Sequence, residues 1–212
     1  FEDIKSFKYI LPDLVRAFFY LIGRMRKFIE KIRNVYPLSD KALSLFLEKT
    51  ERAFYPKGHL LIRSDVTARY SYFIISGYAR GFFYKEERDV TIWFASSGMS
   101  LLSMNGYMFG SAGYENIELL EDCDLLKISN ESLNGLFEEN IELANWGRRM
   151  SDQIILELEK LVMERCFISA SERYHLLIKQ EPEILQKVPL RHIASYLGIS
   201  QVSLSRIRAG VQ

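Results

Sequence analysis

The last part of the chain contains the pattern that most restricts how this protein can fold. Apolar side chains recur over residues 190–209 where two short helices would bury them against each other; these are Ile193, Leu197, Ile199, Leu204 and Ile207. Ala194 stands where a larger side chain would push the helices apart, and Gly198 where the backbone needs a left-handed turn. Ser200 can cap the second helix. Because every position of the pattern matches, the segment predicts a helix-turn-helix.

The second helix of such a motif enters the major groove of DNA, where its free side chains can contact bases. Arginine recognises guanine through two hydrogen bonds, glutamine does the same with adenine, and valine contacts the thymine methyl group. This chemistry predicts base-reading roles for Gln201, Val202 and Arg206. Phosphate contacts position a protein without reading sequence, and we assign them to Arg191, Ser200, Ser203 and Arg208. For each arginine the alternative is an ordinary solvated surface charge.

The distribution of charge is uneven, although the whole chain carries a net charge of only +1. Residues 1–33 carry 8 basic and 4 acidic side chains, residues 34–164 carry 13 and 20, and residues 165–212 carry 7 and 3. An acidic middle and a basic C-terminal end suggest two different tasks. The basic end coincides with the predicted helix-turn-helix, which favours a nucleic-acid partner for that part.

The middle of the chain has the pattern of a β protein. Short runs rich in Tyr, Phe, Ile and Val alternate with glycines, and they predict strands over residues 59–62, 70–75, 78–84, 90–94, 116–120 and 124–128. Several short strands at regular spacing indicate an antiparallel β-roll or jelly roll. A helix capped by Ser39 precedes them over residues 39–50. With the helices that follow, the fold class is α+β.

Two amphipathic helices flank the strands. The first has apolar residues at helical spacing, namely Leu14, Phe18, Leu21, Ile22, Met25, Ile29 and Ile32. Charged residues interrupt it too often for a membrane span, so we expect it to pack on the body or on a second subunit. No membrane partner is predicted.

The second helix is long and apolar along one side. It covers residues 141–165 without a proline, and its stripe contains Ile141, Ala144, Ile154, Ile155, Leu158, Leu161 and Val162. Such a helix often pairs with a copy of itself, and packing on its own barrel is the alternative. Ser169 and Glu172 then form a capping box that begins a new unit. The predicted division is an N-terminal helical segment (1–33), a β-roll (34–140), a dimerisation helix with its hinge (141–168) and a helix-turn-helix domain (169–212).

Three stretches carry a resemblance to a known family. They are Phe-Ile-Ile-Ser-Gly-Tyr-Ala-Arg at residues 73–80, Ala-Ser-Glu-Arg-Tyr at residues 170–174, and the helix-turn-helix itself. The chain resembles, over about residues 35–210, the family of the cyclic-AMP receptor protein and the fumarate-nitrate reduction regulator (CRP/FNR). The resemblance implies a cytoplasmic, bacterial, homodimeric transcription regulator with a cyclic-nucleotide-binding-like roll. Its partners would be double-stranded palindromic DNA with half-sites about 34–36 Å apart, a small-molecule effector and, as a further candidate, RNA polymerase.

The chain departs from this family where a nucleotide phosphate would bind. Nucleotide-binding members hold the phosphate with an arginine and the ribose with a glutamate, but the matching residues 98–118 contain no Arg, Lys or His. A buried phosphate without a cation is costly, so we expect an effector other than cyclic AMP. The apolar residues of this cassette could line an effector pocket or simply fill the roll; they are Met99, Leu101, Leu102, Met104, Tyr107, Met108 and Phe109.

Neither a cofactor nor catalysis is expected. An iron–sulfur cluster needs about four thiolates, and the chain has 2 cysteines, Cys123 and Cys166. We expect His59, His175 and His192 at the surface or as capping residues rather than as haem ligands. A cupin-like metal enzyme needs clustered histidines and carboxylates, whereas the strand region holds only His59. The alternative function is a small-ligand-binding roll with weak or lost DNA binding.

Overall fold

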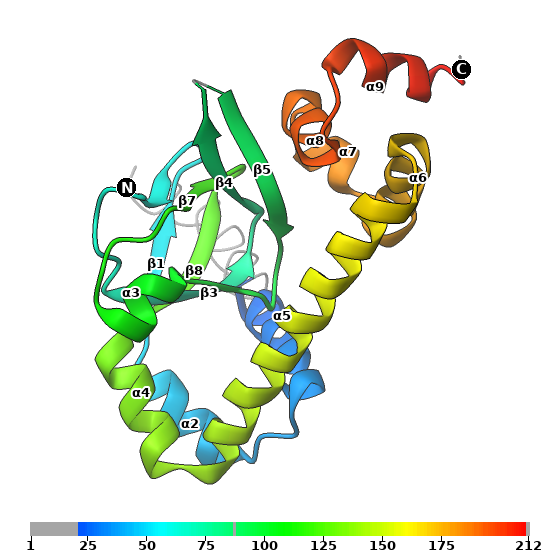
Figure 1. Cartoon of the computed structure of the whole chain (residues 1–212). Helices are drawn as coiled ribbons and strands as arrows, with labels where there is room; N and C mark the ends of the chain where they lie inside the picture. The colour runs from blue at the N-terminus through cyan, green and yellow to red at the C-terminus, as the bar shows by residue number, and fades with distance from the viewer. Residues whose placement is uncertain (1–20, 87, 211–212) are drawn as a thin grey trace, which may run out of the picture.

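The strands of the protein form two four-stranded antiparallel sheets in the computed structural model, which describes residues 21–86 and 88–210 (Figure 1). One sheet has the order β1 (Glu51–Tyr55), β8 (Cys123–Ser129), β3 (Tyr70–Ser76) and β6 (Ser100–Leu101). The other has the order β2 (Leu60–Ile62), β7 (Asn116–Leu119), β4 (Ala79–Lys85) and β5 (Arg88–Ala95). Side chains of both sheets, such as Ile74, Leu125 and Ile117, share one buried core. The predicted antiparallel roll and α+β class are confirmed.

The strand predictions missed three short elements of the roll. All six predicted strands are present, but β1, β6 and the helix α3 (Met104–Phe109) were not expected. β1 is an edge strand that pairs with β8 alone, and most of its side chains are exposed, so its sequence lacks an apolar alternation. The six residues of α3 depend on the Ser103 cap and on a left-handed Gly110. The two-residue β6 and the single-turn α3 carry too little pattern to detect.

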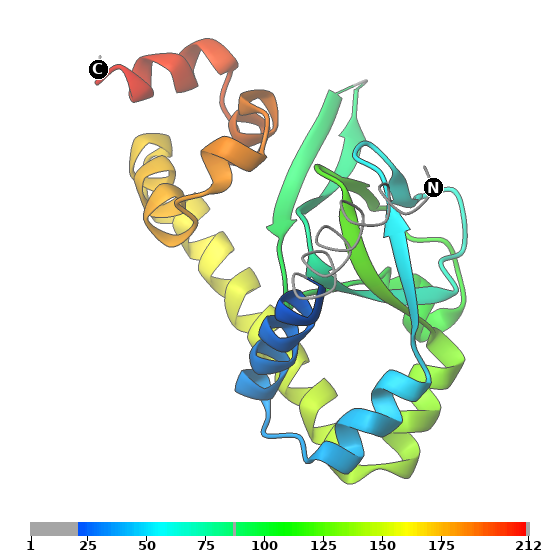
Figure 2. The same ribbon diagram turned by 180° about the vertical axis from the view of Figure 1, so that it is seen from behind.

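A second core joins the roll to the surrounding helices. The helices around the roll are one over residues 21–35, α2 (Asp40–Glu48), α4 (Asn130–Glu139) and α5 (Ile141–Phe167). The core contains Phe28 of the first helix, Phe46 of α2, Phe73 of β3 and Trp146 of α5. Ring centroids lie 5.1 Å apart for Phe46 and Phe73 and 5.5 Å apart for Phe73 and Trp146. The helix over residues 21–35 therefore packs on the body, as Figure 2 shows. The first part of that predicted amphipathic helix lies outside the described residues.

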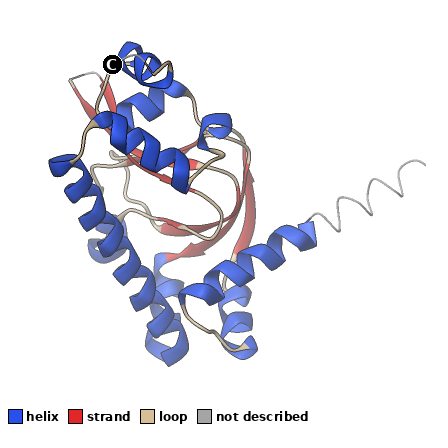
Figure 3. Cartoon of the chain, turned by 90° about the vertical axis from the view of Figure 1, so that its right-hand side faces the viewer, coloured by secondary structure: helices blue, strands red, loops and turns tan. Residues whose placement is uncertain are grey.

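α5 leaves the roll and carries the C-terminal helices at its far end (Figures 1 and 3). Leu143, Trp146 and Gly147 are buried near its start, whereas the apolar side chains Ile155 and Leu158 farther along are 62% and 48% exposed. The C-terminal helices, which we call the head, are α6 (Ala170–Gln180), α7 (Ile184–Lys187), α8 (Leu190–Leu197) and α9 (Gln201–Arg208). Among the described residues, no helix is long and apolar enough to cross a membrane.

Candidate nucleic-acid interface

α8, a tight turn and α9 form the predicted helix-turn-helix. Ile193, Leu197 and Leu204 are at most 1% exposed and pack with Tyr174 of α6 in the core of the head. Gly198 has φ +70°, the left-handed conformation that glycine adopts without a Cβ penalty. α9 begins after Ser200, which caps it as the sequence predicts. The sequence prediction of two crossed helices is therefore confirmed at the level of the fold.

α9 presents one face to solvent. Leu204 and Ile207 hold the opposite face against the head. At 3.6 residues per turn, Val202 and Arg206 lie near the centre of the free face and Gln201 lies on its flank. All three side chains are exposed, Val202 by 64%. The structure thus brings the predicted base-reading residues together on one accessible surface, and their contact with bases stays a prediction.

The predicted phosphate contacts lie around this surface. The Ser200 hydroxyl accepts the backbone N–H of Ser203 at 3.1 Å and lies 2.9 Å from the Ser203 hydroxyl. It therefore caps α9, where the positive end of the helix dipole favours an anion. Arg208 is exposed in the last turn of α9, and Arg191 is exposed in the first turn of α8. Their phosphate role likewise stays a prediction.

Two arginines fix the head to the end of α5. Arg173 donates to the carbonyl of Ile168 at 2.7 Å and to that of Leu197 at 3.0 Å. Arg165 donates to the carbonyl of Tyr196 at 3.2 Å. The last carbonyls of a helix have no partner within it, so these guanidinium groups satisfy the end of α8 while they tie it to α5. No local sequence pattern indicated these bonds, because Arg173 and Leu197 are 24 residues apart.

The head also docks on the roll, through a contact that the sequence did not reveal. β5 is the outer strand of its sheet, and Ser195 of α8 bonds to its free edge. The Ser195 hydroxyl donates to the carbonyl of Asp89 at 2.8 Å and accepts the N–H of Thr91 at 2.9 Å. The rings of Phe94 and Tyr196 lie 5.3 Å apart beside it. The Ser195 side chain thus satisfies two backbone groups of β5 that a neighbouring strand would otherwise bond.

A buried charged cluster lies beneath this contact. Arg80 of β4 is 4% exposed and pairs with Asp89 at 2.6 Å and Glu118 at 2.7 Å. His192 of α8 is 2% exposed, its Nδ1 lies 3.7 Å from Asp89, and its Nε2 accepts a hydrogen bond from Arg191 at 3.2 Å. The expectation that His192 is a surface or capping residue is therefore wrong. Its neighbours come from strands that are distant in sequence, so no local pattern could indicate its burial.

Burial lowers the pKa of His192 to about 4, and the positive charges of Arg80 and Arg191 act in the same direction. The carboxylates of Glu118 and Asp89 oppose this shift with smaller effects. Because the ordinary pKa of histidine is about 6.5, His192 is neutral near pH 7 in the docked head. The head therefore docks with an uncharged imidazole at this position.

The residues of the predicted effector pocket are dispersed. Leu101 is fully buried, Leu102 and Tyr107 are half-buried, and the other four are exposed, from Met99 at 47% to Phe109 at 76%; these four are Met99, Met104, Met108 and Phe109. None of the seven lines either of the two cavities described for this chain. The physical reason is that α3 lies on the outside of the roll with one side in solvent. An effector pocket formed by these residues stays a prediction.

Inside the roll, a bulky side chain occupies the space beside β4. A Cβ built on Gly81 would lie 2.2 Å from the indole of Trp93, so the ring rests directly on the glycine backbone. In the cassette, a Cβ on Gly113 would lie 2.7 Å from the Glu115 carboxylate. A carboxylate at that position repels an incoming phosphate. The expectation of an effector other than cyclic AMP stays a prediction.

No protein-family model and no curated protein match the chain, but solved structures do. The c-di-GMP-responsive global regulator CLP of Xanthomonas campestris is 19% identical, with a TM-score of 0.63 over 81% of this chain and 91% of that one. FixK2 of Bradyrhizobium japonicum is 18% identical, with a TM-score of 0.66 over 76% and 83%. A putative CRP/FNR-family regulator of Eubacterium rectale is 19% identical, with a TM-score of 0.66 over 84% and 87%. With its antiparallel roll, long connecting helix and C-terminal helix-turn-helix, this chain has the fold of the CRP/FNR transcription regulators.

Proposed function

We propose that this protein is a cytoplasmic, non-enzymatic transcription regulator that binds a palindromic operator as a homodimer and responds to an effector other than cyclic AMP. The observation that carries the proposal is the free face of α9, which presents Gln201, Val202 and Arg206 together on a helix-turn-helix. Arginine and glutamine on such a face have the donors that base edges in the major groove recognise. The fold of the CRP/FNR regulators supports the same conclusion.

Each proposed domain would have its own task. Residues 34–140 would sense the effector, residues 141–168 would pair two copies, and residues 169–212 would bind DNA. Of the N-terminal segment (1–33), the described residues 21–33 pack beside the roll. The exposed apolar stripe of α5 supports the pairing, because a monomer would leave Ile155, Leu158 and Val162 in water. An effector would act by changing how the head sits on the roll. RNA polymerase is a further proposed partner.

Selection from a random DNA pool tests the proposal directly. The purified protein, with and without cell extract, should enrich a two-fold symmetric site whose half-sites lie about one helical turn apart. Failure to enrich any sequence under either condition would contradict DNA binding and favour the small-ligand-binding alternative.

Replacing Arg206 by alanine should weaken binding to the selected operator by about 1–3 kcal/mol and relax the preference at one base pair. Fluorescence anisotropy on the operator and on random DNA measures both effects. The matched control is Arg208→Ala, which should reduce affinity for both DNAs alike if Arg208 contacts phosphate. Equal losses on operator and random DNA for Arg206→Ala would refute its base-reading role.

A further inference from the structure

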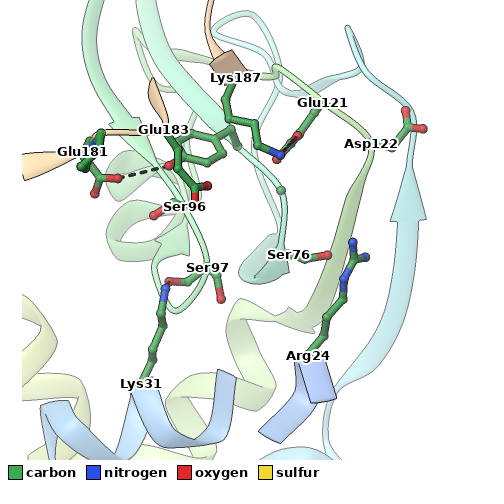
Figure 4. Close-up of a pocket in the computed structure, with 13 residues that line it drawn as sticks. Arg24, Lys31, Ser76, Ser96, Ser97, Glu121, Asp122, Glu181, Glu183 and Lys187 are labelled. Carbon is green, nitrogen blue, oxygen red and sulfur yellow. Dashed lines mark hydrogen bonds and ion pairs between the residues drawn. The ribbon is translucent and has the colours of Figure 1, made fainter. Parts of the chain in front are cut away.

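A cavity of about 550 Å³ lies where three parts of the protein meet (Figure 4). Its walls come from the helix over residues 21–35, from loops of the roll around Gly77 and Ser97, and from the turn between α6 and α7 in the head. Small-molecule sites typically have volumes of about 300–1,000 Å³. A molecule in this cavity would touch the head directly, because Glu181, Pro182, Glu183 and Lys187 line it.

One wall of the cavity carries a fixed positive charge. The Lys31 ammonium donates to the carbonyl of Ser97 at 2.8 Å. The stem of Lys31 lies over Gly98, where a Cβ would come within 2.8 Å of it and the backbone has φ +92°. An ammonium group has three donors, and no carboxylate among the described residues pairs with Lys31. Its remaining donors are therefore available to an anion in the cavity.

The opposite wall carries a negative charge from the head. Figure 4 shows Glu183, which immediately precedes α7, with its carboxylate directed into the cavity. The Glu183 backbone carbonyl accepts from Gln186 and Lys187, but no hydrogen bond or ion pair joins its carboxylate to another described residue. The neighbouring acidic groups already have partners, since Glu121 pairs with Lys187 at 2.9 Å and Glu181 accepts from the Tyr78 hydroxyl at 3.1 Å.

The cavity also contains a polar atom without a partner. The Ser76 hydroxyl is buried, and no described residue bonds to it. Buried polar groups normally have a hydrogen-bond partner, so this atom is a donor and acceptor left for something else. The cavity thus presents a cation, a hydroxyl and an anion from three separate segments.

We propose that this cavity binds a small zwitterion of the amino-acid type, with its carboxylate at Lys31 and its ammonium at Glu183. A simple anion would be repelled by Glu183 and Asp122, and a simple cation by Lys31, so only a ligand with both charges gains at both walls. Such a ligand would link the helix over residues 21–35 to the head. The role of this ligand as the effector rests on the proposed function; the binding site itself does not.

Thermal unfolding of the full chain tests this site with defined probes. The standard L-amino acids are added one at a time, with acetate and methylamine as single-charge controls. At least one amino acid should raise the Tm by about 3–6 °C at tenfold its Kd, and neither control should do so. The proposal is overturned if no amino acid shifts the Tm or if acetate or methylamine shifts it equally.

Variants then locate the binding site. Lys31→Met and Glu183→Gln should each weaken binding of the active amino acid by about tenfold or more, because each removes a charged hydrogen-bonding group. The matched controls Lys27→Met and Glu138→Gln, at exposed positions outside the cavity, should bind like the wild type. Undiminished binding by Lys31→Met or Glu183→Gln would refute the site.

Operator affinity is measured on the same samples. If the amino acid is the effector, it must change operator affinity, and the operator must change the affinity for the amino acid by the same factor. Ligand binding without DNA binding would refute the proposed function and leave the site intact, whereas DNA binding without ligand binding would do the reverse.

Discussion

Replacing Leu158 by glutamate should convert the protein from a dimer to a monomer and lower its operator affinity at least about 100-fold. Leu158 is 48% exposed at the middle of the stripe that also contains Ile154, Ile155 and Val162. Burying a leucine contributes about 1.5–3 kcal/mol, and a two-fold interface loses that contribution twice. The substitution also places two like charges in an apolar contact. A monomer holds one half-site only, so the second head no longer contributes to binding.

Size-exclusion chromatography with light scattering and operator titration measure the two consequences together. The control is Gln153→Glu, which adds the same charge on the opposite side of the same helix and should leave both properties unchanged. A Leu158→Glu protein that stays dimeric would exclude this stripe as the interface. A monomer with undiminished operator affinity would instead separate DNA binding from dimerisation.

Lowering the pH from about 7.5 to about 5 should destabilise the docked head by about 2 kcal/mol through His192 alone. The sign follows from its pKa, which is about 4 in the folded protein against about 6.5 in the unfolded chain. Between these two values the unfolded chain binds more protons than the folded protein, so stability falls as pH falls. Above about pH 7.5 both states are almost entirely neutral at this residue, and its contribution no longer depends on pH.

Urea unfolding of the wild type and of His192→Gln at both pH values isolates this contribution. The glutamine variant does not titrate, so it should lose about 2 kcal/mol less than the wild type on acidification. His175, which is exposed on α6, supplies the control, and His175→Gln should follow the wild type. An identical loss in His192→Gln and the wild type would show that the imidazole does not control docking. The protection factor of Thr91 against hydrogen exchange, which compares its rate with the intrinsic rate at the same pH, should fall at low pH in the wild type, because its N–H is bonded to Ser195.

Local patterns predicted the individual elements well because each is stabilised within a few residues. The Ser169 capping box is present, with Glu172 bonded to the Ser169 backbone at 2.8 Å. Gly198 adopts the left-handed turn, and Ser200 caps α9. The same method missed β1, whose order comes from pairing with β8, about 70 residues away in sequence. Its register depends on a neighbour that no short window contains.

The amino-acid sequence by itself determined the helix-turn-helix, the strands of the roll and the long helix between them, because hydrophobic periodicity and capping act over one or two turns. Residues 98–118 hold no basic side chain, and this absence is the basis for expecting an effector other than cyclic AMP. Only the tertiary structure decided that Ser195 and His192 dock on β5 and that Lys31 and Glu183 face one cavity. Burial and electrostatic contact between segments 100 or more residues apart depend on how the chain folds back on itself, and that arrangement has no local signature.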